Sequence, residues 1–386
     1  MTPQARLQSS IEILDLIIEA AKTNGAAADT IIANWFKTRR FAGAKDRRAV
    51  RELVYRAIRA FGTRPHSGRA AFLGLGKDLR PLFDGTPYAP AEFDSKEAVA
   101  GPSPLSAWLV GLIDPAEHEA LLGRAPLDLR VNRLMAERDD LLAAFEGAEA
   151  VGRDGIRLAE NINVEQHAAF KAGQIDIQDA GSQLIAQMCA AKAGMTVVDL
   201  CAGAGGKTLA LAADMANDGT LIATDTNRDR LQRIAARAER MGITIAETRL
   251  LNPGEERETL VDLKVQSDVV LIDAPCSGSG TWRRNPEARW RLTAKRLEAV
   301  VETQAHVLEL GASLVKPGGA LVYAVCSLID REGPDHIAAF LAKHKRGWTA
   351  VPHQGDMGIA HGDGTRLSPA RDGCDGFFIA RLARTG

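Results

Sequence analysis

The chain has 386 residues, of which 46% are hydrophobic and 25% are charged, and its formal net charge is −1. This length and composition leave room for two or three globular domains with ample core, and the charge excludes a uniformly polycationic protein. No apolar run reaches the roughly 18 residues that a membrane span needs, and no signal peptide opens the chain, so we expect a cytoplasmic protein.

The cysteine and histidine content indicates a reducing compartment. The five cysteines are odd in number and form no C-x-x-C pair, and the eight histidines form no ligand cluster. We therefore expect a protein without a bound metal, and we expect it to be a monomer.

The N-terminal part of the chain predicts helices with a basic surface. Apolar residues at helical spacing predict helices over 7–18, 31–36 and Arg47–Phe61, the last of which Asp46 can cap. Residues 1–64 contain 12 lysines and arginines against 6 acidic residues, a net charge of +6. Basic side chains crowd together in this part, and such a cluster of positive charge favours contact with phosphate groups. The alternative is that these side chains only form a solvated helix face. The cluster comprises Arg39, Arg40, Lys45, Arg47, Arg48, Arg51, Arg56 and Arg59.

The next part predicts a linker followed by a small α+β module. Prolines and glycines over 65–104 are typical of loops, and a linker is expected there. The expected elements after it are a helix over 106–122, strands over 126–132, 155–158 and 175–178, a helix over 138–145 and a helix over 183–191.

The stretch from Thr196 to Thr208 predicts a cofactor loop. A buried strand over Val197–Cys201 runs into a glycine-rich turn, and a helix over Lys207–Met215 follows. The glycines allow backbone to approach a ligand closely, and the helix N-terminus offers free N–H groups. The loop lacks the G-x-x-x-x-G-K-[ST] pattern, so phosphate cradling is not the preferred interpretation. The glycines of the turn are Gly203, Gly205 and Gly206.

A second strand, Leu221–Asp225, strengthens this prediction. Asp225 lies 19 residues after Gly206, which matches the spacing of about 20 at which an acid reaches a ribose hydroxyl in such folds. Asp225 could equally cap the helix expected over Arg228–Met241, and the two roles are compatible.

From residue 197 onward, strands and helices alternate. This order predicts a mainly parallel, doubly wound sheet whose ligands bind at the carboxyl ends of the strands. The expected strands are 197–201, 221–225, 243–248, 268–273, 320–326 and one near 376–382.

Two of these strands end in a cysteine, Cys276 after Asp273-Ala274-Pro275 and Cys326 after Val325. A single buried cysteine is more often a core residue than a nucleophile, but two at strand ends beside a cofactor loop shift that balance. Carbon C5 of a pyrimidine takes a methyl group only after a nucleophile adds to C6, and a thiolate can be that nucleophile. The base must be unstacked for such an attack. Methylation of an exocyclic amine would need no thiol.

These stretches together resemble the RsmB/Nol1/NSUN family of RNA 5-methylcytosine methyltransferases. The matching pieces are D-L-C-A-G-A-G-G-K-T, the Asp225 strand, D-A-P-C-S-G-S-G-T-W-R-R-N-P, Y-A-V-C-S, D-G-F-F-I-A-R-L, L-R-V-N and Q-D-A-G-S-Q. The N-terminal helices resemble the NusB-like RNA-binding domain of the bacterial 16S ribosomal RNA branch. The resemblance implies a Rossmann-like class I S-adenosylmethionine methyltransferase domain, over 177–386. It also implies a NusB-like helical domain with its linker over 1–122 and a small α+β RNA-binding module over 123–176.

The resemblance also implies roles for individual residues. Cys326 would attack C6, Cys276 would assist product release, and Asp273 would hold the cytosine near the methyl group. Asp225 would hold the ribose of S-adenosylmethionine. The remaining cofactor-binding residues would be Cys201, Ala202, Gly203, Ala204, Gly205, Gly206, Lys207, Asn252 and Asp273.

The chain departs from the family pattern at three places. Asn252 follows the third strand where the family often has an acid, Val325 precedes Cys326 in place of threonine, and 331–334 replaces an acidic run. Three functions therefore remain open from the sequence: methylation of ribosomal RNA, which the NusB-like helices favour, methylation of transfer RNA, and non-catalytic RNA binding in assembly.

Overall fold

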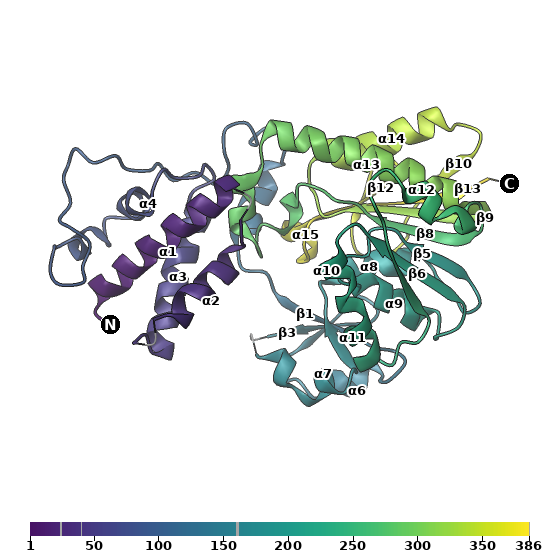
Figure 1. Cartoon of the computed structure of the whole chain (residues 1–386), viewed down its shortest axis with the longest axis horizontal. Coiled ribbons are helices and arrows are strands. Elements are labelled where there is room, and N and C mark those ends of the chain that lie inside the picture. Colours follow the sequence, from purple (N-terminus) through teal and green to yellow (C-terminus); the bar gives the residue numbers. More distant parts are fainter. Residues whose placement is uncertain (24, 40, 160–161, 386) are drawn as a thin grey trace. The chain divides into compact units, whose positions relative to one another are not determined.

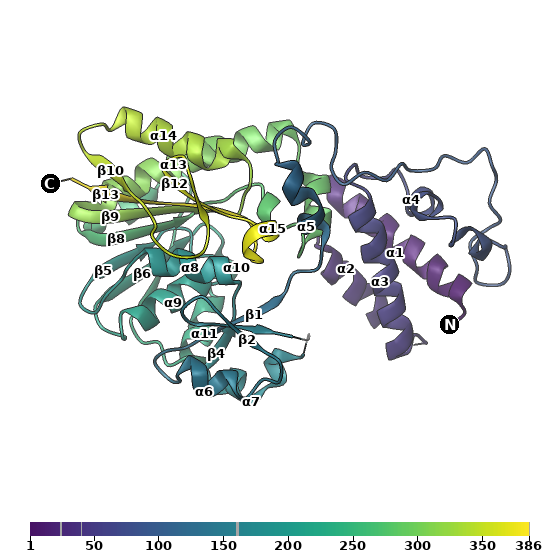
Figure 2. The same ribbon diagram turned by 180° about the vertical axis from the view of Figure 1, so that it is seen from behind.

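The structure is a computed structural model that describes residues 1–23, 25–39, 41–159 and 162–385. It divides into two units, which Figures 1 and 2 show from opposite sides. One consists of Met1–Arg124 with Thr281–Ala294, and the other of Ala125–Gly280 with Lys295–Gly386. Residues 281–294 follow the first cysteine stretch in the sequence, yet they belong to the N-terminal unit, which no local pattern predicted.

The N-terminal unit is helical. Its main helices are α1 (Pro3–Thr23), α2 (Ala28–Lys37), α3 (Ala44–Ala60) and α4 (Gly68–Leu75). Leu7, Leu14 and Val54 are fully buried in one core cluster that these helices share, as their helical spacing predicted. Shorter elements are η1 (Arg80–Leu82), η2 (Pro115–Glu117), α5 (His118–Leu122) and η6 (Pro286–Arg291), and η5 (Ser279–Thr281) lies where the chain passes between the units.

Two predictions for this unit were wrong. Gly43, not Asp46, precedes α3 as its N-cap, and Asp46 lies in the first turn, where its carboxylate accepts from Arg6 Nε at 2.9 Å. The helix expected over 106–122 forms only at its end, as η2 and α5, because Pro115 interrupts the segment and turns precede it.

Residues 286–291 are held in the helical unit by hydrogen bonds to helix ends. Arg289 is 2% exposed, and its Nη2 donates to the carbonyl oxygens of Ile58, at 2.6 Å, and Arg59, at 2.8 Å, which end α3. Glu287 accepts from the N–H of Ala28, the first residue of α2, at 3.0 Å. A cation at a helix C-terminus and an anion at an N-terminus both suit the helix dipole.

The second unit begins with a four-stranded antiparallel sheet in the order β2-β3-β1-β4, seen from behind in Figure 2. Asn132 ties it to the rest of the unit, because its buried Nδ2 donates to the carbonyl oxygens of Gly173 and Met241, both at 2.9 Å. Its elements are β1 (Leu127–Val131), α6 (Arg138–Leu142), β2 (Glu149–Val151), β3 (Gly155–Leu158), η3 (Val164–Gln166), α7 (Ala168–Lys171) and β4 (Ile175–Ile177).

The main sheet has nine strands in the order β11-β12-β13-β9-β8-β5-β6-β7, with β10 paired to β13. The neighbours β7, β6, β5, β8 and β9 are parallel, which confirms the predicted doubly wound core. The antiparallel strands β10, β11 and β12 were missed, because their short, partly exposed segments lack a clear apolar pattern. The strands are β5 (Thr196–Asp199), β6 (Thr220–Asp225), β7 (Ala246–Leu250), β8 (Ser267–Asp273), β9 (Val315–Val325), β10 (Trp348–Val351), β11 (Ile359–His361), β12 (Gly364–Leu367) and β13 (Phe377–Arg384).

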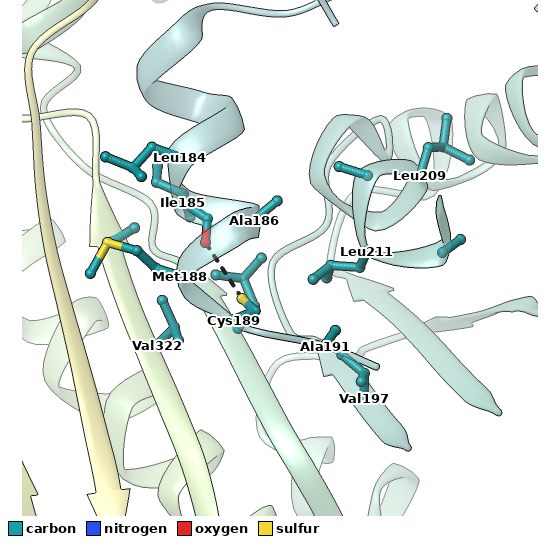
Figure 3. Close-up of a cluster of buried hydrophobic side chains, with 14 of the residues drawn as sticks. Leu184, Ile185, Ala186, Met188, Cys189, Ala191, Val197, Leu209, Leu211 and Val322 are labelled. Atoms are coloured by element: carbon teal, nitrogen blue, oxygen red, sulfur yellow. Dashed lines mark hydrogen bonds between the residues drawn. The ribbon is translucent and has the colours of Figure 1, made fainter. Parts of the chain in front are cut away.

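Helices cover both faces of this sheet (Figure 1). Val197 packs with α8 (Ala180–Met188) and α9 (Gly206–Asp214), in the cluster that Figure 3 shows around Leu184 and Leu211. Its neighbour Val198 points to the opposite face, into the cluster that contains Leu308 of α13 (Ala294–Leu314). The remaining helices of the unit are α10 (Arg228–Leu231), α11 (Arg233–Arg240), α12 (Glu256–Thr259), η4 (Val261–Leu263), η7 (Asp330–Glu332), α14 (Pro334–Lys343) and α15 (Pro369–Asp372).

Two helix predictions in this unit need correction. The helix expected over 228–241 is divided into α10 and α11, and its N-cap is Asn227, whose Oδ1 accepts from the N–H of Arg230 at 3.0 Å. The helix expected over 183–191 begins earlier, because the Asp179 side chain caps it by accepting from the N–H of Gly181 at 2.9 Å. Among the described residues, no helix combines the length and the apolar character that a membrane crossing requires.

Candidate active site

A pocket of about 750 Å³ opens at the carboxyl ends of β5, β6 and β8. Three of the predicted site residues line it, namely Cys201, Asp225 and Asp273. Asn252 is not among the lining residues, because its Nδ2 donates to Glu255 Oε2 at 3.0 Å on the surface. The other lining residues are Leu200, Thr226, Asn227, Arg230, Leu251, Pro253, Glu256, Pro275, Glu302, Thr303, His306, Val307 and Leu310.

The glycine turn lies directly beside this pocket, and Asp225 fixes its position. The N–H of Gly203 donates to Asp225 Oδ2 at 2.8 Å, and Asp225 Oδ1 accepts from the N–H of Asn227 at 2.7 Å. Gly205 has φ +83, and a Cβ there would meet Ile234 at 2.7 Å, so this position requires glycine. The Ala204 carbonyl accepts a hydrogen bond from the Arg237 guanidinium.

Beneath the turn, Lys207 forms an ion pair with Asp273, with Nζ 2.5 Å from Oδ2. Burial lowers the pKa of Lys207, but the charges of Asp273 and Asp199 outweigh burial, so this pKa lies above its ordinary value and the side chain stays charged. Burial also raises the pKa of Asp199 to about 7, against the hydrogen bond that Thr208 donates to it. Burial raises the pKa of the Cys201 thiol, so Cys201 lines the pocket as a neutral side chain.

The two predicted cysteines come together. Strands β8 and β9 are parallel neighbours with Asp273 paired to Ala324, so the residues after both strands share one edge of the sheet. Cys276 Sγ lies 3.2 Å from Cys326 Sγ. The hydrogen bond with Cys326, burial and the charge of Glu332 raise the pKa of Cys276 well above its ordinary value, so Cys276 is held as a neutral thiol.

Sequence reasoning missed the residues that hold the two cysteine loops. The carboxylate of Glu332, which is fully buried, accepts hydrogen bonds from Ser277 and Ser327, the residues that follow the two cysteines. Glu332 is the one acid in the 331–334 stretch, which departs from the acidic run of the family, and this retained acid was the signal in the sequence. Arg237 was also missed, since it belongs to no short pattern, and Asp199 opens the D-L-C-A-G-A-G-G-K-T stretch but was given no role of its own. Among the described residues, no group of three or more histidine, cysteine or acidic side chains could hold a metal ion.

The sheet, the glycine turn and the pocket at the strand ends define a Rossmann-like, S-adenosylmethionine-dependent methyltransferase. Residues 186–383 match the model of the family described as 16S rRNA methyltransferase RsmB/F. The chain belongs to this family, which confirms the resemblance drawn from the sequence.

Two relatives show the extent of the likeness. The chain is 33% identical over 280 residues to ribosomal RNA small subunit methyltransferase B of Enterobacter sp. (strain 638), covering 70% of this chain and 63% of that protein. It is 30% identical over 361 residues to the probable ribosomal RNA small subunit methyltransferase B of Bacillus subtilis (strain 168), covering 87% of this chain and 78% of that protein. Thus less than two thirds of the Enterobacter protein is matched.

Solved structures share the fold. The crystal structure of PH0851 covers 99% of both chains with a TM-score of 0.76 and 24% identity. The crystal structure of NSun6 from Pyrococcus horikoshii with SFG covers 70% of this chain and 94% of that chain, with a TM-score of 0.61 and 19% identity.

The pocket fits the cofactor of this family, S-adenosylmethionine. The Asp225 carboxylate stands at the end of β6, where acids bind ribose hydroxyls in such sheets. Leu251, Pro253 and Val307 offer apolar wall to an adenine ring. The volume of about 750 Å³ is within the range of small-molecule sites.

Proposed function

We propose that the protein forms 5-methylcytosine in RNA, with 16S ribosomal RNA as its substrate, through a covalent bond between a cysteine and C6 of the base. The observation that carries this proposal is the pair of thiols 3.2 Å apart beside a cofactor pocket. A methyltransferase acting on an exocyclic amine would have no use for a thiol pair there.

In the proposed reaction, S-adenosylmethionine supplies an electrophilic methyl group when bound. Asp225 would hold its ribose and the glycine turn, from Cys201 to Lys207, would surround it. Asn252 is left out of this proposal, since it does not line the pocket and its Nδ2 donates to Glu255.

The proposed division of work between the cysteines follows the family resemblance, and the raised pKa of Cys276 supports it. The Cys326 thiolate adds to C6, which makes C5 nucleophilic. C5 then takes the methyl group, and its proton passes to water as the C6–S bond breaks and returns Cys326 as a thiolate. Cys276, held as a neutral thiol by its raised pKa, is suited to release of the product, because its S–H can donate a hydrogen bond to the departing Cys326 sulfur 3.2 Å away. Asp273 would position the base, since Lys207 occupies only its Oδ2 in the ion pair and Oδ1 can accept from the cytosine amine.

We also propose that the basic cluster of the helical unit binds RNA phosphates in the cytoplasm. Arg47, Arg48 and Arg51 are exposed on α3, and Arg51 lies 3.5 Å from the exposed Asp29. Arg40, another member of the predicted cluster, lies outside the described residues.

The test is methyl transfer to defined RNA. The full chain is incubated with methyl-labelled S-adenosylmethionine and either 16S ribosomal RNA or transfer RNA from cells that lack this enzyme. The RNA is then digested to nucleosides for mass spectrometry. We expect labelled 5-methylcytidine from the ribosomal RNA alone. Label in transfer RNA only would mean that transfer RNA, and not ribosomal RNA, is the substrate. The absence of label from both RNAs would refute the proposed activity.

The relatives named ribosomal RNA small subunit methyltransferase B support ribosomal RNA over transfer RNA as the substrate.

A further inference from the structure

Glu332 lies at the end of η7, six residues after Cys326, which directly follows β9. Its side chain is fully buried, away from the pocket that the cofactor would occupy. A carboxylate is costly to bury unless hydrogen bonds compensate it, so its partners show what it does.

The partners of this carboxylate come from both cysteine loops. Its Oε1 accepts from the N–H of Ser277 at 2.7 Å, and its Oε2 accepts from the hydroxyls of Ser277 and Ser327. Ser277 directly follows Cys276, and Ser327 directly follows Cys326. One carboxylate therefore bonds to the residue next to each of the two thiols.

Further hydrogen bonds fix the carboxylate itself. Gln304 Nε2 donates both to Glu332 Oε1, at 3.1 Å, and to the carbonyl of Pro275, at 2.9 Å. The Tyr323 hydroxyl donates to the backbone carbonyl of Glu332 at 2.8 Å. The Glu332 side chain thus receives four hydrogen bonds from N–H and O–H donors, a pattern that only an ionised carboxylate satisfies fully.

We propose that Glu332 is a positioning residue that sets the separation of Cys276 and Cys326 by binding the serine next to each. This proposal rests on the proposed function for its catalytic consequence, but the geometric claim stands without it. Glu332 bonds no thiol, so it acts through the two loops. Its charge also contributes to the raised pKa of Cys276, which keeps that thiol protonated.

The test uses Glu332→Gln in the full chain, because glutamine has the same shape but only one acceptor oxygen. Its amide N–H groups would face the serine hydroxyl and N–H donors, which should push the two loops apart. Glu332→Asp keeps both acceptors and is the rescue variant. Glu298→Gln is the matched control, since Glu298 is exposed and pairs with the neighbouring Arg331 at 2.7 Å.

The first readout is the rate at which Cys276 and Cys326 form a disulfide without RNA or cofactor, because this rate depends on how close the two thiols are. Diamide oxidises two adjacent thiols to a disulfide and takes up their two protons and two electrons. Mass spectrometry follows the rate of disulfide formation, and the Cys276→Ala variant gives the background. We expect Glu332→Gln to slow disulfide formation by about 10-fold or more, because the reaction requires the sulfurs to meet. Loss of the Glu332 charge alone would lower the pKa of Cys276 and speed the reaction, so a slower rate reports displacement.

The second readout is methyl transfer. We expect kcat to fall about 100-fold in Glu332→Gln with the KM for S-adenosylmethionine unchanged, as for a misplaced catalytic group. We expect partial recovery in Glu332→Asp and none of these effects in Glu298→Gln. Circular dichroism checks that each variant folds. If Glu332→Gln does not fold, the Ser277→Ala and Ser327→Ala double variant removes the two hydroxyl hydrogen bonds to Glu332 Oε2, while the Ser277 N–H bond to Oε1 remains, and it should give the same two effects in weaker form.

The outcomes separate the two proposals. Wild-type rates of disulfide formation and methyl transfer in a folded Glu332→Gln protein would overturn the positioning role and leave the proposed function standing. An inactive wild-type enzyme whose disulfide formation still depends on Glu332 would overturn the proposed function and retain the positioning role.

Discussion

Cys276 and Cys326 are 50 residues apart in the sequence, yet their sulfur atoms lie 3.2 Å apart. They meet because β8 and β9 are adjacent parallel strands, and parallel neighbours bring their carboxyl ends to the same edge. The hydrogen bond with Cys326, burial and the charge of Glu332 raise the pKa of Cys276. Sulfur atoms at this distance can act on one base together, so the role of each is tested by replacing the two cysteines in turn.

Replacement of Cys276 and replacement of Cys326 should affect methyl transfer and the covalent RNA adduct differently. Cys326→Ala cannot form the C6 adduct, so methyl transfer and any covalent species should both vanish. Cys276→Ala should still attack the base but release it slowly, and a denaturing gel should show an RNA-shifted protein band. Enzymes that methylate C5 in DNA place their nucleophile in the Pro-Cys stretch, so the opposite assignment is a real competitor.

The same gel decides between the two assignments. A trapped band in Cys326→Ala and none in Cys276→Ala would reverse the roles proposed here. Cys374→Ala is the matched control, because Cys374 is fully buried in the core cluster outside the site and its loss should leave the gel pattern unchanged.

Asp225 should be required for cofactor affinity. Asp225→Ala removes a charged acceptor of ribose hydroxyls and also frees the N–H of Gly203 from its hydrogen bond. Titration calorimetry with S-adenosylmethionine should show a loss of on the order of 1.5–3 kcal/mol in binding free energy. Asp218→Ala, at an exposed acid outside the pocket, is the control. Unchanged affinity in a folded Asp225→Ala protein would remove Asp225 from the cofactor site.

Local sequence patterns predicted the residues at the strand ends, but not the residues that hold these loops and segments in place. The turn after β5, the acid at the end of β6 and the two cysteine loops each lie within a few residues of a strand end, so spacing alone locates them. Glu332 is different, because its role depends on a fold that brings the loop after β8 against the turn after β9. The attachment of 281–294 to the helical unit, through the burial of Arg289 against the end of α3, likewise depends on contacts more than 200 residues apart.

The basic cluster of the helical unit should bind RNA through its phosphates. Replacing Arg47, Arg48 and Arg51 by glutamate should weaken RNA binding in a filter assay, and the salt dependence of binding should become shallower. Cofactor affinity should not change. Reversal of Lys343, Lys345 and Arg346, which are exposed in the other unit, changes the charge equally and serves as control. Equal losses of RNA affinity in both triple variants would mean that only net charge matters. Unchanged RNA affinity in the Arg47, Arg48 and Arg51 variant would mean that the cluster is only a solvated helix face.

Asp199 should give stability a pH dependence of unusual sign for a carboxyl group. Its side chain is fully buried, its Oδ2 accepts from Thr208 at 2.7 Å, and its Oδ1 has no hydrogen-bond partner among the described residues. Burial raises its pKa from 3.8 to about 7. A raised pKa means that the folded state binds the proton more tightly than the unfolded chain, so this contribution to stability is fully present below pH 4 and is lost as pH rises through 7.

Asp199→Asn removes this titration while it keeps the shape and one acceptor for Thr208. The stability of the variant relative to the wild type should therefore rise by on the order of 4 kcal/mol between pH 4 and pH 8, since each unit of pKa shift corresponds to about 1.4 kcal/mol. Urea unfolding at a series of pH values measures this difference, and Asp218→Asn, at an exposed acid, should show no such trend. A constant difference between Asp199→Asn and the wild type across this range would show that Asp199 does not take up a proton on folding.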